Sequence, residues 1–172
     1  IESERKLLEK IKVKSNYVID TSNLTPRQLK EELINIVERG IAFKGLIISI
    51  ISFGFKYGIP IDCDLVFDVR FIPNPYYQES MRRLTGLNEN VRDFVEKSPE
   101  TGEFMNKLID MLDFLIPNYI KEGKSQLVIG IGCTGGRHRS VVIAEALKKL
   151  LEERQQRVVV DKRDINKDGR DD

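Results

Sequence analysis

Two hydrophobic patterns alternate along this chain. Short apolar runs predict strands, at residues 17–20, 44–53, 65–71, 126–131 and 157–160. Apolar positions three or four residues apart predict helices, at residues 2–12, 26–39, 99–117 and 140–153, and residues 76–88 are expected to form a loop or a short helix. Because strands and helices alternate, we expect an α/β fold, with a mostly parallel sheet and helices on both of its faces.

Local signals mark the ends of two of these helices. Thr25 can cap the first of them, Pro26 suits a first helical turn, and Gln28 stands where a capping box closes. Pro117 is expected to kink or end the longer helix, because proline has no amide for the helical hydrogen bond.

The composition narrows the class of protein. The chain has 172 residues, 41% of them hydrophobic, with 28 basic and 27 acidic residues and a net charge of +1, which argues against a uniformly basic nucleic-acid binder. The longest apolar stretch, residues 46–55, is about half of the roughly 20 residues that a membrane helix needs. With two cysteines and one histidine, we expect no disulfide scaffold and no metal site, and we expect a cytoplasmic protein without membrane association.

The stretch that carries the chemistry is Gly-Ile-Gly-Cys-Thr-Gly-Gly-Arg-His-Arg-Ser at residues 130–140. Its glycines allow several backbone amides to converge, and the helix that follows adds unpaired N–H groups and a partial positive charge. Arg137 or Arg139 can supply a fork of donors, and His138 is expected to contact the ligand. We therefore predict an anion-binding loop between a strand and a helix N-terminus. The alternative is a tight turn with exposed arginines.

The same loop matches a second pattern. Cys133 and Arg139, followed by Ser140, have the Cys-x5-Arg spacing of cysteine-dependent phosphatases, in which a thiolate attacks phosphorus. Such an enzyme also needs a general acid. The sequence does not place its aspartates, so phosphatase chemistry stays an alternative to binding.

Three further patterns have two interpretations each. Asp68 and Arg70 share a face of their strand and either form an ion pair or reach the anion site. The alternating Phe53, Phe55 and Tyr57 form either a stacking platform for bases or one buried face of a strand end. Residues 164–169 match the first half of a calcium loop, but no predicted helix precedes them, which favours a solvated tail.

Separated motifs in order along the chain resemble those of the RapZ/YvcJ family of bacterial proteins. They are the stretches at residues 52–60, 67–71, 73–75, 84–87 and 130–140, and residues 19–24 match the end of the family's first domain. The resemblance implies a first, P-loop kinase-like domain that binds and hydrolyses ATP or GTP. It also implies a second domain that, in the best understood member, binds glucosamine 6-phosphate and small RNAs and presents them to a ribonuclease.

The chain has no Gly-x4-Gly-Lys-Ser/Thr loop, so ATP or GTP is implied only for a nucleotide domain that this chain lacks. We expect residues 1–40 to be the end of that first domain, residues 41–165 to be the sugar-phosphate domain, and residues 166–172 to be a polar tail. The expected function is that of a regulatory binding domain and adaptor, without catalysis of its own. The expected partners are a sugar phosphate, with a small RNA, a ribonuclease and a second copy of the chain as further candidates.

By this resemblance, the phosphate site includes Thr134, Gly135, Gly136, His138 and Arg139. The full set of expected ligand-binding residues is Cys133, Thr134, Gly135, Gly136, Arg137, His138, Arg139, Ser140, Asp68, Arg70 and Asn74. Two departures bear on the ligand. Tyr76 stands where the enterobacterial member has histidine, and residues 157–172 carry five basic and five acidic side chains, a balance that disfavours phosphate-backbone binding.

Overall fold

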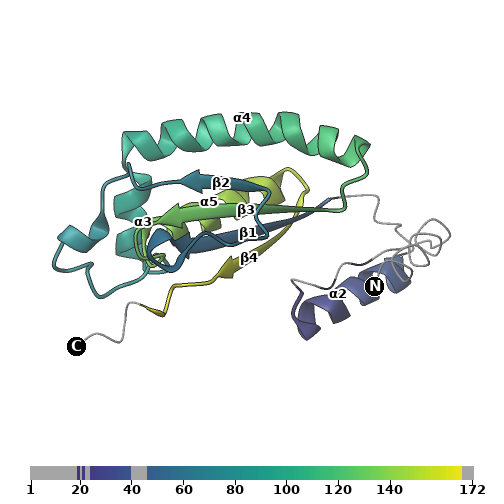
Figure 1. Cartoon of the computed structure of the whole chain (residues 1–172), viewed down its shortest axis with the longest axis horizontal. Coiled ribbons are helices and arrows are strands. Elements are labelled where there is room, and N and C mark those ends of the chain that lie inside the picture. Colours follow the sequence, from purple (N-terminus) through teal and green to yellow (C-terminus); the bar gives the residue numbers. More distant parts are fainter. Residues whose placement is uncertain (1–18, 20, 22–23, 40–45, 168–172) are drawn as a thin grey trace. The chain divides into compact units, whose positions relative to one another are not determined.

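A computed structural model describes residues 19, 21, 24–39 and 46–167 of the chain (Figure 1). The chain divides into two units, Ile1–Lys44 and Gly45–Asp172. The first unit contains helix α2, Pro26–Arg39. The predicted capping box is present at its start, because Gln28 Oε1 accepts the Thr25 amide at 2.8 Å and Thr25 Oγ1 accepts the Gln28 amide at 3.3 Å. The helix predicted at residues 2–12 and nearly all of the strand predicted at 17–20 lie outside the described residues.

The second unit is built on a four-stranded sheet with the order β2-β3-β1-β4. The strands are β1 (Ile47–Gly54), β2 (Leu65–Asp68), β3 (Gln126–Cys133) and β4 (Arg157–Lys162). All three strand pairs are parallel, and Gly54 is opposite Cys133 in the register of the two central strands. The predicted α/β fold with a parallel sheet is confirmed.

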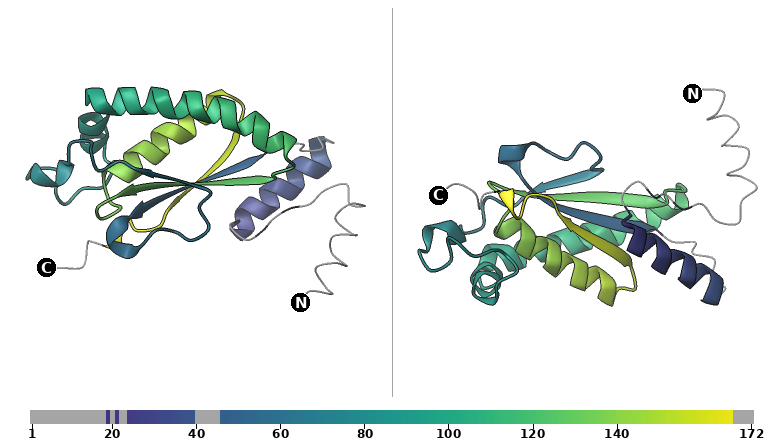
Figure 2. Two further views of the ribbon diagram at one scale, coloured as in Figure 1. Left: turned by 45° about the horizontal axis from the view of Figure 1, so that its top comes forward. Right: turned by 90° about the horizontal axis from the view of Figure 1, so that it is seen from below.

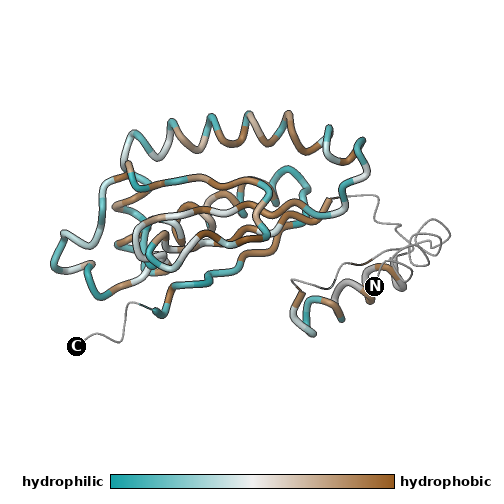
Figure 3. Tube along the Cα trace, viewed as in Figure 1, coloured by the Kyte–Doolittle hydropathy of each residue, from teal (hydrophilic) through white to brown (hydrophobic). Residues whose placement is uncertain are grey.

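Three helices cover one face of this sheet (Figures 1 and 2). They are α3 (Glu89–Glu96), α4 (Pro99–Lys121) and α5 (Arg139–Glu153). Alternate residues of β1 and β3 point into a core shared with all three helices, and they include Ile48, Ile50, Leu127, Ile129 and Ile131. Figure 3 shows the central strands as mainly hydrophobic, whereas α4 alternates in character as a helix with one buried side does.

The opposite face is covered by the connection between β1 and β2, so helices lie on one face instead of the two expected (Figure 2). Gly130 and Gly132 of β3 leave room for this cover, because a side-chain carbon on Gly132 would lie 2.6 Å from Phe53 and from Phe55. Phe53 is fully buried, and the Phe53 and Phe55 rings meet edge to face at 5.0 Å. This supports the buried-face interpretation of the aromatic alternation.

Besides shifts of one to three residues at other element ends, three features differ from the prediction. Strand β2 ends at Asp68 instead of residue 71, because the Asp68 carboxylate accepts the Arg70 amide and turns the chain. Helix α3 was not predicted, and it begins at the cap formed by Asn88. Helix α4 continues past Pro117 to Lys121, so the proline does not end it. None of the helices among the described residues is long and apolar enough to cross a membrane.

Candidate functional site

The glycine-rich loop, residues 134–138, connects the carboxyl end of β3 to the start of α5. It lies directly against the end of β1. A side-chain carbon on Gly54 would be 2.5 Å from the carbonyl carbon of Gly135, and one on Gly136 would be 2.6 Å from the Gly54 nitrogen. Gly136 also has a φ of +75°, which favours glycine. The sequence therefore folds here only because both backbones lack side chains at the point of contact.

The loop folds around the thiol of Cys133. Its Sγ accepts the Gly136 amide at 3.2 Å and lies 3.2 Å from Ser140 Oγ. Both Cys133 and Ser140 are buried. Among the described residues, the backbone N–H groups of Gly135, Arg137 and His138 donate to no protein acceptor, and α5 adds the partial positive charge of its N-terminus. The loop therefore has both the donors and the field that an anion requires.

Arg139 lies beneath this loop and is only 4% exposed. Its Nη1 donates to the carbonyls of Arg70 at 2.7 Å and Ile72 at 2.9 Å, and its Nη2 donates to Thr134 Oγ1 at 3.2 Å. Its Nε has no partner among the described residues. Burial lowers the pKa of the guanidinium, although Cys133 and Asp68 act in the opposite direction. Arg139 thus fixes the loop to the segment after β2 and supplies positive charge below Thr134.

His138 is 6% exposed, and its Nε2 has no hydrogen-bond partner in the described part of the chain. Burial lowers the pKa of the imidazole, while the backbone of Leu84 and Met81 raises it. An unpartnered buried nitrogen is costly and calls for an explanation. The backbone of Leu84 and Met81 lies near enough to the imidazole to act on its pKa, and His138 also lines the pocket described next.

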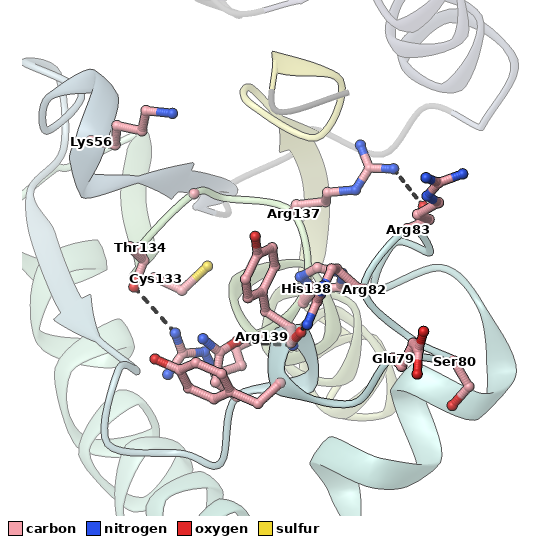
Figure 4. Close-up of a pocket in the computed structure, with 14 residues that line it drawn as sticks. Lys56, Glu79, Ser80, Arg82, Arg83, Cys133, Thr134, Arg137, His138 and Arg139 are labelled. Atoms are coloured by element: carbon pink, nitrogen blue, oxygen red, sulfur yellow. Dashed lines mark hydrogen bonds between the residues drawn. The ribbon is translucent and has the colours of Figure 1, made fainter. Parts of the chain in front are cut away.

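A pocket of about 1200 Å³ opens over the loop (Figure 4). In Figure 4, Cys133, Thr134 and Arg139 lie on one side of it, and Glu79 and Ser80 lie on another. Of the described residues that line it, only Glu79 carries a carboxylate. The lining residues are Lys56, Asn74, Tyr76, Tyr77, Glu79, Ser80, Arg82, Arg83, Cys133, Thr134, Gly135, Arg137, His138 and Arg139. Because basic side chains dominate this lining, the pocket suits an anionic ligand.

The expected site residues fall into two groups. Cys133, Thr134, Gly135, Arg137, His138, Arg139 and Asn74 line the pocket. The Arg137 guanidinium donates to three backbone carbonyls, those of Arg83 at 2.7 Å, Leu84 at 3.0 Å and Ile165 at 3.3 Å, and Figure 4 shows the link to Arg83. The Arg137 guanidinium therefore holds the backbone of the pocket wall in place through these hydrogen bonds.

Asp68, Arg70, Gly136 and Ser140 are not among the lining residues. Asp68 and Arg70 form the ion pair that the sequence allowed, with Arg70 Nη2 at 2.6 Å from Asp68 Oδ2. Hydrogen bonds from the Arg70 side chain lower the pKa of Asp68. The Arg70 guanidinium also lies over the Phe55 ring at 4.3 Å. Gly136 and Ser140 act from inside the loop through their bonds to Cys133.

Sequence reasoning missed the outer wall of the pocket. This wall consists of Tyr76, Tyr77, Glu79, Ser80, Arg82 and Arg83, with Lys56 from the connection after β1. The Arg82 guanidinium lies over the Tyr76 ring at 5.1 Å and donates to the Tyr76 carbonyl at 3.2 Å. The departure at Tyr76 was the one signal that pointed to this segment.

No group of three or more metal-ligating side chains occurs in the described ranges. The stretch that resembles half of a calcium loop begins at Asp164, whose carboxylate is fully buried. Arg163 and Lys167 each pair with it at 2.6 Å. The Asp164 carboxylate is therefore already paired with two cationic side chains of the protein itself.

Comparison with known proteins identifies the family. The family described as the RapZ C-terminal domain matches residues 46–166, and the chain belongs to it. A "nucleotide-binding protein" of Acetivibrio thermocellus is 66% identical over 170 residues, which are 99% of this chain and 58% of that relative. One of Ruminiclostridium cellulolyticum is 63% identical, with the same shares, and one of Caldanaerobacter subterraneus is 59% identical over 98% of this chain and 59% of the relative. The chain thus spans a little under three fifths of the length of these curated relatives.

Proposed function

We propose that the second unit is a regulatory binding domain that recognises a phosphorylated sugar, with the phosphate on residues 133–139. The observation that carries this proposal is the loop itself. It combines unpartnered backbone amides, the N-terminus of α5 and the buried Arg139 at the edge of a basic pocket. Phosphate oxygens are the ligands that such an arrangement suits best.

The remainder of the pocket favours a sugar over inorganic phosphate. Asn74 lines the pocket beside the loop and has a side-chain amide that can bond to a hydroxyl or amino group. Tyr76 and Tyr77 line the same pocket and offer ring faces and hydroxyl groups. An amino-sugar phosphate such as glucosamine 6-phosphate fits this division of tasks, in agreement with the family resemblance.

The wider role that we propose is that of a cytoplasmic adaptor. The relatives' names state nucleotide binding. Since this chain has no Walker loop, we assign the nucleotide site to the part of those proteins that the chain does not cover. The balanced charge of residues 157–172 supports weak RNA binding at most, because affinity for a phosphate backbone depends on cationic contacts.

Calorimetric titration tests the binding proposal. We expect glucosamine 6-phosphate to bind more tightly than inorganic phosphate, and glucosamine to bind least. Thr134→Val removes the exposed hydroxyl that Arg139 contacts and should weaken binding of the sugar phosphate by roughly 0.5–1.5 kcal/mol. Asp64→Ala is the control, because Asp64 does not line the pocket and should leave affinity unchanged. The absence of any heat with both phosphate compounds would contradict the proposal.

A second candidate function is phosphate-ester hydrolysis, and one observation favours it. Cys133 Sγ accepts the Gly136 amide and lies beside Ser140 Oγ, so the sulfur stands among hydrogen-bonding groups on the loop that would hold a phosphate ester. Within the described lining, Glu79 is the carboxyl group available as a general acid.

The two candidate functions, hydrolysis and recognition, make different predictions for Cys133→Ser. We expect wild-type protein to release no phosphate from para-nitrophenyl phosphate or glucosamine 6-phosphate above background. Cys133→Ser should therefore retain binding of the sugar phosphate. A burst of product that disappears in Cys133→Ser would make the phosphatase the better hypothesis.

A further inference from the structure

Asp164 is a fully buried acidic residue in the segment that follows β4. Its Oδ2 accepts the backbone amide of Gly54 at 2.8 Å. Gly54 is the last residue of β1 and lies against the backbone of Gly135. A residue 110 positions away in the sequence thus bonds directly to the strand end that supports the anion loop.

Asp164 also touches the loop itself. A side-chain carbon built on Gly136 would lie 2.8 Å from the Asp164 Cβ and 2.6 Å from the Gly54 nitrogen. Gly54, Gly136 and Asp164 therefore meet at one point, in contacts too close for any added atom. Removing the carboxylate would free the Gly54 amide at this point.

The charge of Asp164 is neutralised by two neighbouring cations. Arg163 Nη2 and Lys167 Nζ each lie 2.6 Å from one of its oxygens. Burial acts to raise the pKa of Asp164, but hydrogen bonds from Arg163, Gly54 and Lys167 outweigh it and the pKa is lowered. The carboxylate is thus ionised at neutral pH, and its two cations limit its repulsion of an anion on the nearby loop.

Neighbouring residues fix the same segment to the sheet and to the pocket. The Arg163 amide donates to the Ser52 carbonyl at 3.1 Å, which extends the pairing of β4 with β1. The Ile165 carbonyl accepts Nη1 of Arg137 at 3.3 Å. The residues before and after Asp164 are therefore bonded, one to β1 and the other to Arg137 of the pocket wall.

We propose that Asp164 is a positioning residue for the anion site: it sets the placement of the Gly135–Gly136 backbone through its hydrogen bond to Gly54 and its contact with Gly136. It makes no contact with the ligand. The inference rests on the proposed function insofar as the loop binds a phosphate group. It adds a residue that the expected site residues did not include and that the pocket lining does not contain.

The test compares three variants of the 172-residue chain with inorganic phosphate and glucosamine 6-phosphate as probes. Asp164→Ala removes the acceptor but keeps the Cβ that lies against Gly136, whereas Asp164→Asn keeps an oxygen of the same reach for the Gly54 amide. Asp64→Ala is a matched control, because Asp64 likewise accepts a strand amide, that of Val128 at 2.8 Å, and pairs with Lys124 at 2.6 Å, away from the pocket. Titration calorimetry gives affinity, thermal unfolding gives stability, and amide NMR reports the loop.

We expect Asp164→Ala to weaken binding of both probes about tenfold or more, as for the loss of a buried hydrogen bond. Asp164→Asn should restore affinity to within about threefold of wild type. Asp64→Ala should lose stability but keep affinity. The amide signals of Gly54, Gly135 and Gly136 should shift in Asp164→Ala without ligand and move back in Asp164→Asn.

Wild-type affinity in Asp164→Ala would overturn the inference, and so would equal losses of affinity in Asp164→Ala and Asp64→Ala at equal losses of stability. If Asp164→Ala does not fold, Asp164→Asn decides: a large loss of affinity in that variant counts against the role of the hydrogen bond. If wild-type protein binds neither probe, the proposed function fails. In that case, unchanged amide signals of Gly135 and Gly136 in Asp164→Ala would overturn the positioning role as well.

Discussion

At the scale of single residues, Arg137 and His138 are neighbours in the loop but differ in their hydrogen bonds. The Arg137 guanidinium donates to the backbone carbonyls of residues 83, 84 and 165. His138 Nε2 is buried and has no partner among the described residues.

The buried His138 predicts how stability depends on pH. Burial lowers the pKa of its imidazole from the ordinary value of 6.5, so the folded state holds it neutral at pH values where the unfolded chain already binds a proton. The free energy of unfolding should therefore fall as pH falls below about 6.5, until the folded-state pKa is reached. His138→Gln should remove this part of the pH dependence.

Urea unfolding at about pH 7.5 and about pH 5.5 measures the effect. Wild type should lose more stability between these conditions than His138→Gln, since both proteins share all other titrating groups. Equal losses in the two proteins would show that the imidazole does not contribute.

The position of the loop between β3 and α5 could be predicted, because clustered glycines and the helix that follows them are local features of the sequence. The partners of Arg137 could not be predicted. They are backbone carbonyls from residues 83, 84 and 165, which come together only in the folded chain.

At the scale of elements, hydrophobic periodicity was sufficient for the strands and for the longer helices. Helix α3 has eight residues and only two fully buried positions, Val91 and Val95, so its periodic signal is short. The outer wall of the pocket, residues 76–83, has turns in place of regular periodicity, and its position depends on contacts such as that between Arg137 and Arg83. These parts are set by tertiary contacts, and the sequence pattern alone did not predict them.

Pro117 gives a prediction for one element. It lies in the interior of α4 on the exposed side, where it cannot donate to the helical ladder. The carbonyl of Asp113, four residues earlier, therefore receives no helical hydrogen bond from residue 117. Pro117→Ala should therefore increase the free energy of unfolding by roughly 1–3 kcal/mol.

Chemical denaturation measures this gain, and phosphate affinity is the control, because Pro117 does not line the pocket. A decrease in stability would show that the proline fits the native backbone and restricts the unfolded chain instead.

At the scale of the whole molecule, the parallel sheet explains why the site lies where it does. The carboxyl ends of β1 and β3 meet at the loop, with Gly54 opposite Cys133. The segment after β4 reaches the same edge through Asp164. Two strand ends and the chain that follows a third thus converge on one helix N-terminus, an arrangement in which open α/β sheets bind their ligands.

By itself, this chain is expected to bind neither ATP nor GTP. It belongs to the RapZ C-terminal domain family, and its relatives are named as nucleotide-binding proteins, but it contains no Gly-x4-Gly-Lys-Ser/Thr loop. Without that loop, no backbone cradle of the P-loop type is available for the β- and γ-phosphates of ATP. We expect calorimetry to show no specific binding of ATP or GTP to the chain, and purified protein to hydrolyse neither. The full-length Acetivibrio thermocellus relative is the positive control and should bind ATP under the same conditions. Saturable ATP binding by the 172-residue chain, displaced by glucosamine 6-phosphate, would instead place a nucleotide in the pocket over residues 133–139.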